Sequence, residues 1–151
     1  MFSGDTVRWK AFYLSLRHPY SNVRRGADML EILILEDYPP LYRALEILLQ
    51  QAGYQVARVQ TAGKALRALS HHAYDLLVMD MDVRHVDFRR LIEELQALPC
   101  HLPVVALISP QSHWAHNGTG IGIQIVLHKP IDRQALLRGI EMGLKNHLNK
   151  V

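Results

Sequence analysis

Acidic side chains follow two apolar runs of this chain, at the points where those runs end. One run leads into Asp80 and Asp82, and an earlier run leads into Glu36 and Asp37. Carboxylates that are crowded together repel one another, and a hard divalent cation such as Mg²⁺ relieves that repulsion through oxygen ligands. If the two runs end side by side, the pattern predicts an acidic crevice that binds Mg²⁺.

A basic residue follows a third apolar run. Residues 123–128 lead into Lys129 and Pro130. A lysine beside a carboxylate cluster is a compact counter-charge, and it can also reach a phosphoryl oxygen. The two acidic sites and the lysine form a constellation typical of phosphoryl chemistry.

The apolar runs show no alternation, which is typical of strands that helices bury on both faces of a parallel sheet. The carboxyl ends of such strands are where open α/β sheets place their ligand sites. The segments between the apolar runs carry leucines at helical spacing, so the chain is expected to alternate strands and helices. The expected strands are 30–35, 54–59, 76–80, 102–108 and 123–128. The helix expected within residues 109–122 should be short, because proline, asparagine and glycine there are poor helix formers.

The composition fits one soluble globular domain. The 151 residues suffice for a full hydrophobic core, and no apolar stretch approaches the roughly 20 residues that span a bilayer. The single cysteine, Cys100, excludes an internal disulfide and is compatible with a reducing cytoplasm. We therefore expect a cytoplasmic protein without membrane contact.

The positive charge is concentrated at the start of the chain. Residues 1–28 carry the whole formal charge of +3, whereas residues 29–151 contain 12 basic and 12 acidic residues. The core has no basic surplus of the kind that nucleic-acid binding requires. We expect an irregular basic N-terminal extension over 1–28, a single domain over 29–148 and a tail over 149–151. Met29 is an equally good start of translation.

The order and spacing of these features resemble a response-regulator receiver domain of two-component signalling, over about residues 29–148. The resemblance implies a flavodoxin-like, doubly wound, five-stranded parallel sheet with strand order 2-1-3-4-5. It implies that Asp80 accepts the phosphoryl group and that Lys129 contacts that group. It also implies that Glu36, Asp37, Asp80 and the backbone carbonyl of Asp82 hold Mg²⁺.

Several positions depart from the family pattern. The family carries a threonine or serine at the end of the fourth strand, where the plain alignment places Ile108 and a shift by one residue places Ser109. The switch aromatic of the family is Val126 here. The proline that the family carries four residues after the acceptor is Arg84, and the glycine after Asp87 is Phe88.

The leading hypothesis is a phosphoacceptor receiver of a phosphorelay. A histidine kinase or a histidine phosphotransfer protein would phosphorylate Asp80, and the receiver would act through a downstream protein partner without binding nucleic acid itself. It would not be an enzyme, apart from at most slow self-dephosphorylation. The departures favour an alternative, a receiver-like adaptor that works without phosphorylation. A Mg²⁺-dependent phosphohydrolase is a third hypothesis, in which Asp82 would be the general acid.

The histidines do not form a metal site by their spacing. His71, His72, His113 and His116 are not placed as a coherent ligand set, and we expect them to be solvated loop residues. Whether the chain is a fragment of a longer protein stays open.

Overall fold

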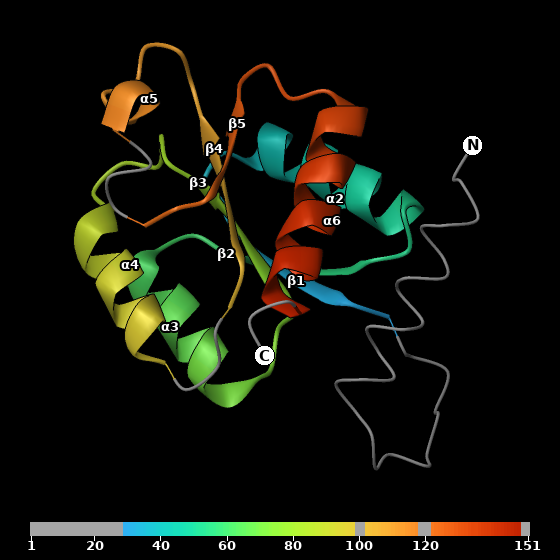
Figure 1. Cartoon of the computed structure of the whole chain (residues 1–151), viewed down its shortest axis with the longest axis horizontal. Coiled ribbons are helices and arrows are strands. Elements are labelled where there is room, and N and C mark those ends of the chain that lie inside the picture. The colour runs from blue at the N-terminus through green and yellow to red at the C-terminus, as the bar shows by residue number, and fades with distance from the viewer. Residues whose placement is uncertain (1–28, 99–101, 118–121, 149–151) are drawn as a thin grey trace.

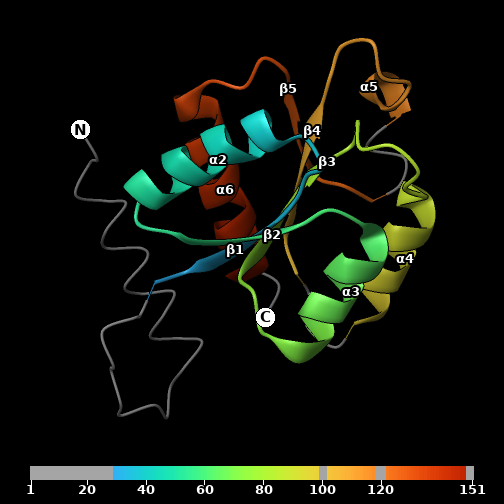
Figure 2. The same ribbon diagram turned by 180° about the vertical axis from the view of Figure 1, so that it is seen from behind.

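A five-stranded parallel sheet in the order β2-β1-β3-β4-β5 forms the centre of the computed structural model, which describes residues 29–98, 102–117 and 122–148 (Figures 1 and 2). The elements in chain order are β1 (Glu31–Leu35), α2 (Pro39–Gln51), β2 (Gln55–Val59), α3 (Ala62–His71), β3 (Leu76–Asp80), α4 (Phe88–Ala97), β4 (Val104–Ile108), α5 (Trp114–Asn117), β5 (Ile125–His128) and α6 (Arg133–Leu148). The predicted fold class and strand order are confirmed.

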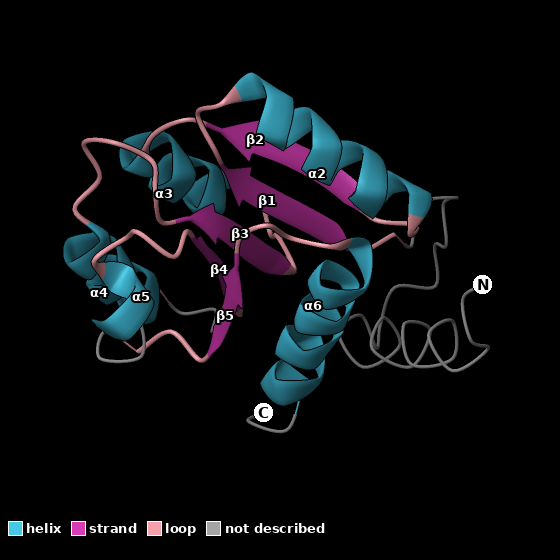
Figure 3. Ribbon diagram, turned by 90° about the horizontal axis from the view of Figure 1, so that it is seen from above, coloured by secondary structure: helices cyan, strands magenta, loops and turns pink. Residues whose placement is uncertain are grey.

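Helices cover both faces of the sheet (Figure 3). Helices α2 and α6 lie on one face, and α3, α4 and α5 lie on the other. Alternate residues of each strand point into the two resulting cores, so that Ile32 and Ile34 join the α2–α6 side while Leu33 and Leu35 join the α3–α4 side. Because both faces are buried, the strands need continuous apolar runs, which is the pattern that identified them.

Side-chain caps start three of the helices where the sequence places capping residues. The Thr61 hydroxyl accepts the Lys64 N–H at 3.2 Å and caps α3. The Asp87 carboxylate accepts the Arg90 N–H at 3.1 Å and caps α4. The Asp132 carboxylate accepts the Ala135 N–H at 2.7 Å at the start of α6. Each cap satisfies a backbone donor that the first turn of a helix leaves unpaired.

Helix α6 approaches the sheet closely at its glycines. A Cβ atom at Gly143 would come within 3.1 Å of Leu76 Cδ1 and 3.3 Å of Ile125 Cδ1. A side chain at this position would force the helix away from the sheet, so the small residue sets the distance between α6 and β3.

The helix expected within residues 109–122 is short, as predicted. Helix α5 covers only four residues, and Trp114 attaches it to the core by an edge-to-face contact with Phe88, with ring centroids 6.2 Å apart. Residues 118–121 lie outside the described residues, as do Cys100 and the side chain of His116.

Strands β4 and β5 begin two residues later than predicted. The predicted ranges 102–108 and 123–128 become Val104–Ile108 and Ile125–His128. Proline at 103 has no N–H to offer a sheet ladder, which fits its place just before β4. Among the described residues, no helix combines the length and apolar character that crossing a bilayer requires.

The predicted extension, residues 1–28, and the predicted tail, residues 149–151, lie outside the described residues. Among the described residues, those that form the two hydrophobic cores run from Leu30 onward. We therefore predict that a chain beginning at Met29 folds, because it retains every described strand and helix. Urea unfolding followed by circular dichroism should show one cooperative transition. Insolubility of the shortened chain would contradict the prediction and would indicate that Trp9, Phe12 and Tyr13 cover part of the core.

Candidate functional site

The carboxyl ends of the strands are tied together by backbone hydrogen bonds. The Met81 N–H donates to the Leu107 carbonyl at 2.9 Å, and the Lys129 N–H donates to the Ile108 carbonyl at 2.9 Å. The Glu36 N–H donates to the carbonyl of Val59 at 3.0 Å. The parallel register therefore continues one residue beyond the strands, and it brings the ends of β1, β3, β4 and β5 to one edge of the sheet.

Asp80 is the buried acid at the centre of this edge. Only 3% of its surface is exposed. One carboxylate oxygen, Oδ1, accepts the Asp82 backbone N–H at 2.8 Å, and the other, Oδ2, accepts from Lys129 Nζ at 2.8 Å. A buried carboxylate is costly unless it is paired and hydrogen-bonded, and these two donors provide that compensation.

Lys129, which follows β5, binds the carboxylates of both Asp80 and Asp82 at the end of β3. Its Nζ lies 3.0 Å from Asp82 Oδ2 as well as 2.8 Å from Asp80 Oδ2. Burial alone would lower the pKa of Lys129, but the hydrogen bonds to Asp80 and Asp82 outweigh it and raise the pKa. The amino group therefore stays charged at neutral pH. The peptide bond between Lys129 and Pro130 is cis.

Glu36 is the second buried acid, with 1% of its surface exposed. Its Oε1 accepts the Tyr38 backbone N–H at 2.9 Å, whereas Oε2 is buried without a hydrogen-bond partner in the described structure. Burial, and next the neighbouring Asp80 carboxyl group, raise the pKa of Glu36 to about 8. Two carboxylates this close repel each other when both are charged, so Glu36 holds its proton at neutral pH unless a cation is bound beside it.

These groups fit a divalent cation in part. Glu36 and Asp80 converge, and the unpartnered Glu36 oxygen is an oxygen ligand of the kind that Mg²⁺ prefers. The Asp37 side chain is exposed, and no group of three or more His, Cys, Asp or Glu side chains in the described part of the chain is arranged to hold a metal ion. The structure therefore brings together Glu36, Asp80 and Lys129, while Asp37 and the Asp82 carbonyl remain predicted ligands.

The two candidates for the hydroxyl position differ in their surroundings. Ile108 is fully buried in the α3–α4 core, where the half-buried Val126 also packs. Ser109 is partly exposed, and its backbone N–H donates to Asp82 Oδ2 at 3.0 Å. Arg84 is exposed in the loop after β3, whereas Phe88 is buried at the start of α4.

Sequence reasoning missed Arg58 of the edge strand β2. Its Nε donates to the Glu36 carbonyl at 3.0 Å, and its guanidinium lies 4.8 Å from the ring centroid of Tyr42. Arg58 thereby holds the backbone that carries the acid pair. A single charged residue within the short predicted strand 54–59 is the signal that could have identified it.

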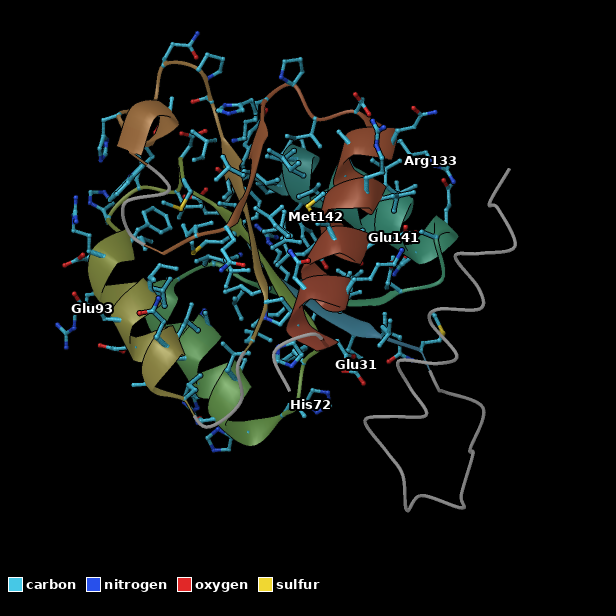
Figure 4. The ribbon with its side chains drawn as sticks, in the orientation of Figure 1. Glu31, His72, Glu93, Arg133, Glu141 and Met142 are labelled. Carbon is cyan, nitrogen blue, oxygen red and sulfur yellow. The ribbon has the colours of Figure 1, made fainter. Side chains whose placement is uncertain are left out.

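His71, His72 and His113 are exposed, as expected, although His71 is the last residue of α3 rather than a loop residue. His72 also pairs with Glu31 at the first residue of β1, so this contact lies at the edge of the sheet opposite the site (Figure 4). It takes no part in the acidic cluster.

The model of the response regulator receiver domain family matches residues 32–141. The chain is 30% identical over 115 residues to the transcriptional regulatory protein GlrR of Escherichia coli K12, an alignment that covers 76% of this chain and 26% of that protein. It is 29% identical over 125 residues to the sensor protein EvgS of E. coli O157:H7, which covers 82% of this chain and 10% of that one. The chain thus spans about a quarter or less of these relatives.

Solved structures agree with that match. The receiver domain of the sensor histidine kinase PA1611 from Pseudomonas aeruginosa, solved with a magnesium ion in its active site cleft, is 27% identical with a TM-score of 0.70, and the alignment covers 78% of this chain and 98% of that one. A putative response regulator from Chloroflexus aurantiacus is 26% identical with a TM-score of 0.71, over 78% of this chain and 98% of that chain. The fold and the family model agree, and the chain belongs to the response regulator receiver domain family.

Proposed function

We propose that this receiver is the phosphoacceptor of a phosphorelay and that Asp80 is the residue phosphorylated. The observation that carries the proposal is the convergence of the buried Asp80 carboxylate with Glu36 and Lys129 at the joined strand ends. The phosphodonor is a phosphohistidine on a histidine kinase or a phosphotransfer protein, and the signal passes on through a downstream protein partner. The protein is a phosphoacceptor rather than a turning-over enzyme, and its place of action is the cytoplasm.

The transfer follows from the chemistry of the site. A carboxylate oxygen of Asp80 attacks phosphorus, the bond from phosphorus to the donor nitrogen breaks, and an acyl phosphate forms while the electron pair stays on the imidazole. Negative charge on the transferring group must be neutralised for a carboxylate to approach it. Lys129 supplies one positive charge, and Mg²⁺ bound by Glu36, Asp37, Asp80 and the Asp82 carbonyl would supply the rest.

The alternative is a receiver-like adaptor that acts without phosphorylation. The core packing of Ile108 and Val126 favours it, because neither residue offers the hydroxyl or the aromatic ring of the family switch. The intact Asp80–Lys129 pair argues against it. Chemical phosphorylation separates the two functions.

Asp80 is predicted to be the residue modified by a small-molecule phosphodonor. Acetyl phosphate with Mg²⁺ should add one phosphoryl group to the wild type, read by intact mass, and should leave Asp80→Asn unmodified. The reason is that Asp80 alone among the site acids contacts both Glu36 and Lys129. Equal labelling of the two proteins would remove the assignment of Asp80.

Stability without Mg²⁺ is predicted to fall as the pH rises. The pKa of Glu36 is raised in the folded protein, so the folded state binds a proton that the unfolded state has already lost between about pH 4.5 and pH 8. The stabilising effect is complete below pH 4.5 and is lost through pH 8. Millimolar Mg²⁺ should replace the proton and restore the melting temperature at pH 8.

Thermal melts at pH 6 and pH 8, with and without Mg²⁺, measure this effect. The Mg²⁺-dependent shift should be larger at pH 8 and should shrink in Asp37→Ala. A shift that is the same in wild type and Asp37→Ala would show that Asp37 does not bind the ion.

Phosphorylation is predicted to change the conformation little beyond the site. With Ile108 in the hydroxyl position, no side chain of β4 can hydrogen-bond to the phosphoryl group. The loss of that bond reduces the free-energy difference between the free and the phosphorylated conformation by about 1 kcal/mol. Backbone amide shifts with and without beryllofluoride should therefore concentrate at Asp80, Asp82 and Lys129 rather than at Val126. Large shifts through residues 109–128 that Ser109→Ala abolishes and Ile108→Val does not would make Ser109 the switch.

A further inference from the structure

The side chain of Asp82 receives donors from two different strand ends. Its Oδ2 accepts from Lys129 Nζ at 3.0 Å and from the Ser109 backbone N–H at 3.0 Å. These bonds join the loop after β3 to the ends of β4 and β5. The family resemblance assigned the backbone carbonyl of Asp82 to the Mg²⁺ site, and these contacts give the Asp82 side chain a role of its own.

The Asp82 carboxylate is charged at neutral pH. Partial burial would raise the pKa of Asp82, but the hydrogen bonds from Lys129 and Ser109 outweigh burial and lower it. A full negative charge therefore shares the amino group of Lys129 with Asp80. The Lys129 amino group therefore donates to two carboxylates at once.

A phosphoryl group on Asp80 would need hydrogen-bond donors that Asp82 now occupies. A phosphoryl group brings three oxygens and up to two negative charges, and it requires charge-assisted hydrogen bonds to be stable in a partly buried site. Lys129 Nζ already touches the Asp80 oxygen Oδ2, and the Ser109 N–H shares an acceptor with that same Nζ. The Asp82 N–H already binds Asp80 Oδ1, so Lys129 and the Ser109 N–H are further donors beside Asp80, and the Asp82 carboxylate occupies both.

We propose, given that Asp80 is the phosphoacceptor, that Asp82 is a positioning residue whose carboxylate competes with the phosphoryl group for Lys129 and the Ser109 N–H. In the free protein Asp82 holds both donors in place. When Asp80 is phosphorylated, the Asp82 side chain releases them and turns toward solvent, to which it is already partly exposed. Asp82 thus restrains phosphorylation and returns the site to its resting state afterwards.

Removal of the competing charge tests the proposal. Asp82→Ala should raise the rate of modification by acetyl phosphate and the affinity for beryllofluoride by roughly tenfold, the scale of one charge-assisted hydrogen bond. Asp82→Asn should give a smaller gain, because its amide oxygen still accepts but carries no charge. Both quantities are measured on the full chain with saturating Mg²⁺, by intact mass and by titration of the Ser109 amide resonance.

Asp132→Asn is the matched control. It removes one negative charge three residues after Lys129, and asparagine keeps the cap on α6 that Asp132 provides. Its rate should equal that of the wild type. An equal gain in Asp132→Asn would overturn the proposal, because it would reflect net charge rather than release of the two donors.

The remaining outcomes separate this proposal from the phosphoacceptor function. If the wild type is modified on Asp80 and neither Asp82 variant is faster, competition by Asp82 is wrong while the function stands. If no protein is modified on Asp80, both are wrong. If Asp82→Ala does not fold, the rate of Asp82→Asn and the amide resonance of Ser109 in the wild type test the proposal instead. The Ser109 amide resonance must shift when beryllofluoride is added. A Ser109 resonance that does not shift overturns the proposal.

Discussion

The ion pairs of Lys129 with Asp80 and Asp82 are the interaction on which the rest of the site depends. Asp80 is buried at the end of a central strand, where an unpaired carboxylate would be strongly destabilising. Lys129 can reach it because the β4–β5 register continues to the hydrogen bond between the Lys129 N–H and the Ile108 carbonyl. The sheet therefore has to be complete through its last strand before the central acid is neutralised.

The same arrangement leaves the site short of positive charge. Lys129 lies between two carboxylates, and Glu36 presents a buried oxygen without a partner. Such a site holds negative charge that a cation, a proton or a rearranged lysine must balance. A phosphoryl group adds anionic oxygens and so changes how that balance is met. This electrostatic change lies at the site itself, next to a core in which Ile108 and Val126 are packed as ordinary apolar residues.

Much of the fold was readable from the sequence because its physical causes are local. Apolar runs without alternation marked the strands, and leucines at helical spacing marked the segments between them as helices. The convergence of Glu36, Asp80 and Lys129 followed from one rule, that parallel strands end at the same edge. The shortness of α5 followed from the helix-breaking residues around it.

Side-chain directions at the site could not be read in the same way. Glu36 and Asp37 are neighbours in sequence, yet one is buried and the other exposed, because the turn into α2 points successive side chains apart. The Asp82 carboxylate binds Ser109 and Lys129 only because three loops meet there. Arg58 on β2 reaches the carbonyl of Glu36, which follows the neighbouring strand β1. These contacts depend on tertiary packing, which no spacing in the sequence encodes.

A crystal structure of the protein with Mg²⁺ and beryllofluoride is the most direct test of the account. We predict beryllofluoride on Asp80 with Lys129 Nζ bound to a fluoride, Mg²⁺ against Glu36 or Asp37, and the Asp82 carboxylate withdrawn from both Lys129 and the Ser109 N–H. An Asp82 carboxylate that stays on both donors, with the fluorides bound elsewhere or absent from Asp80, would contradict it.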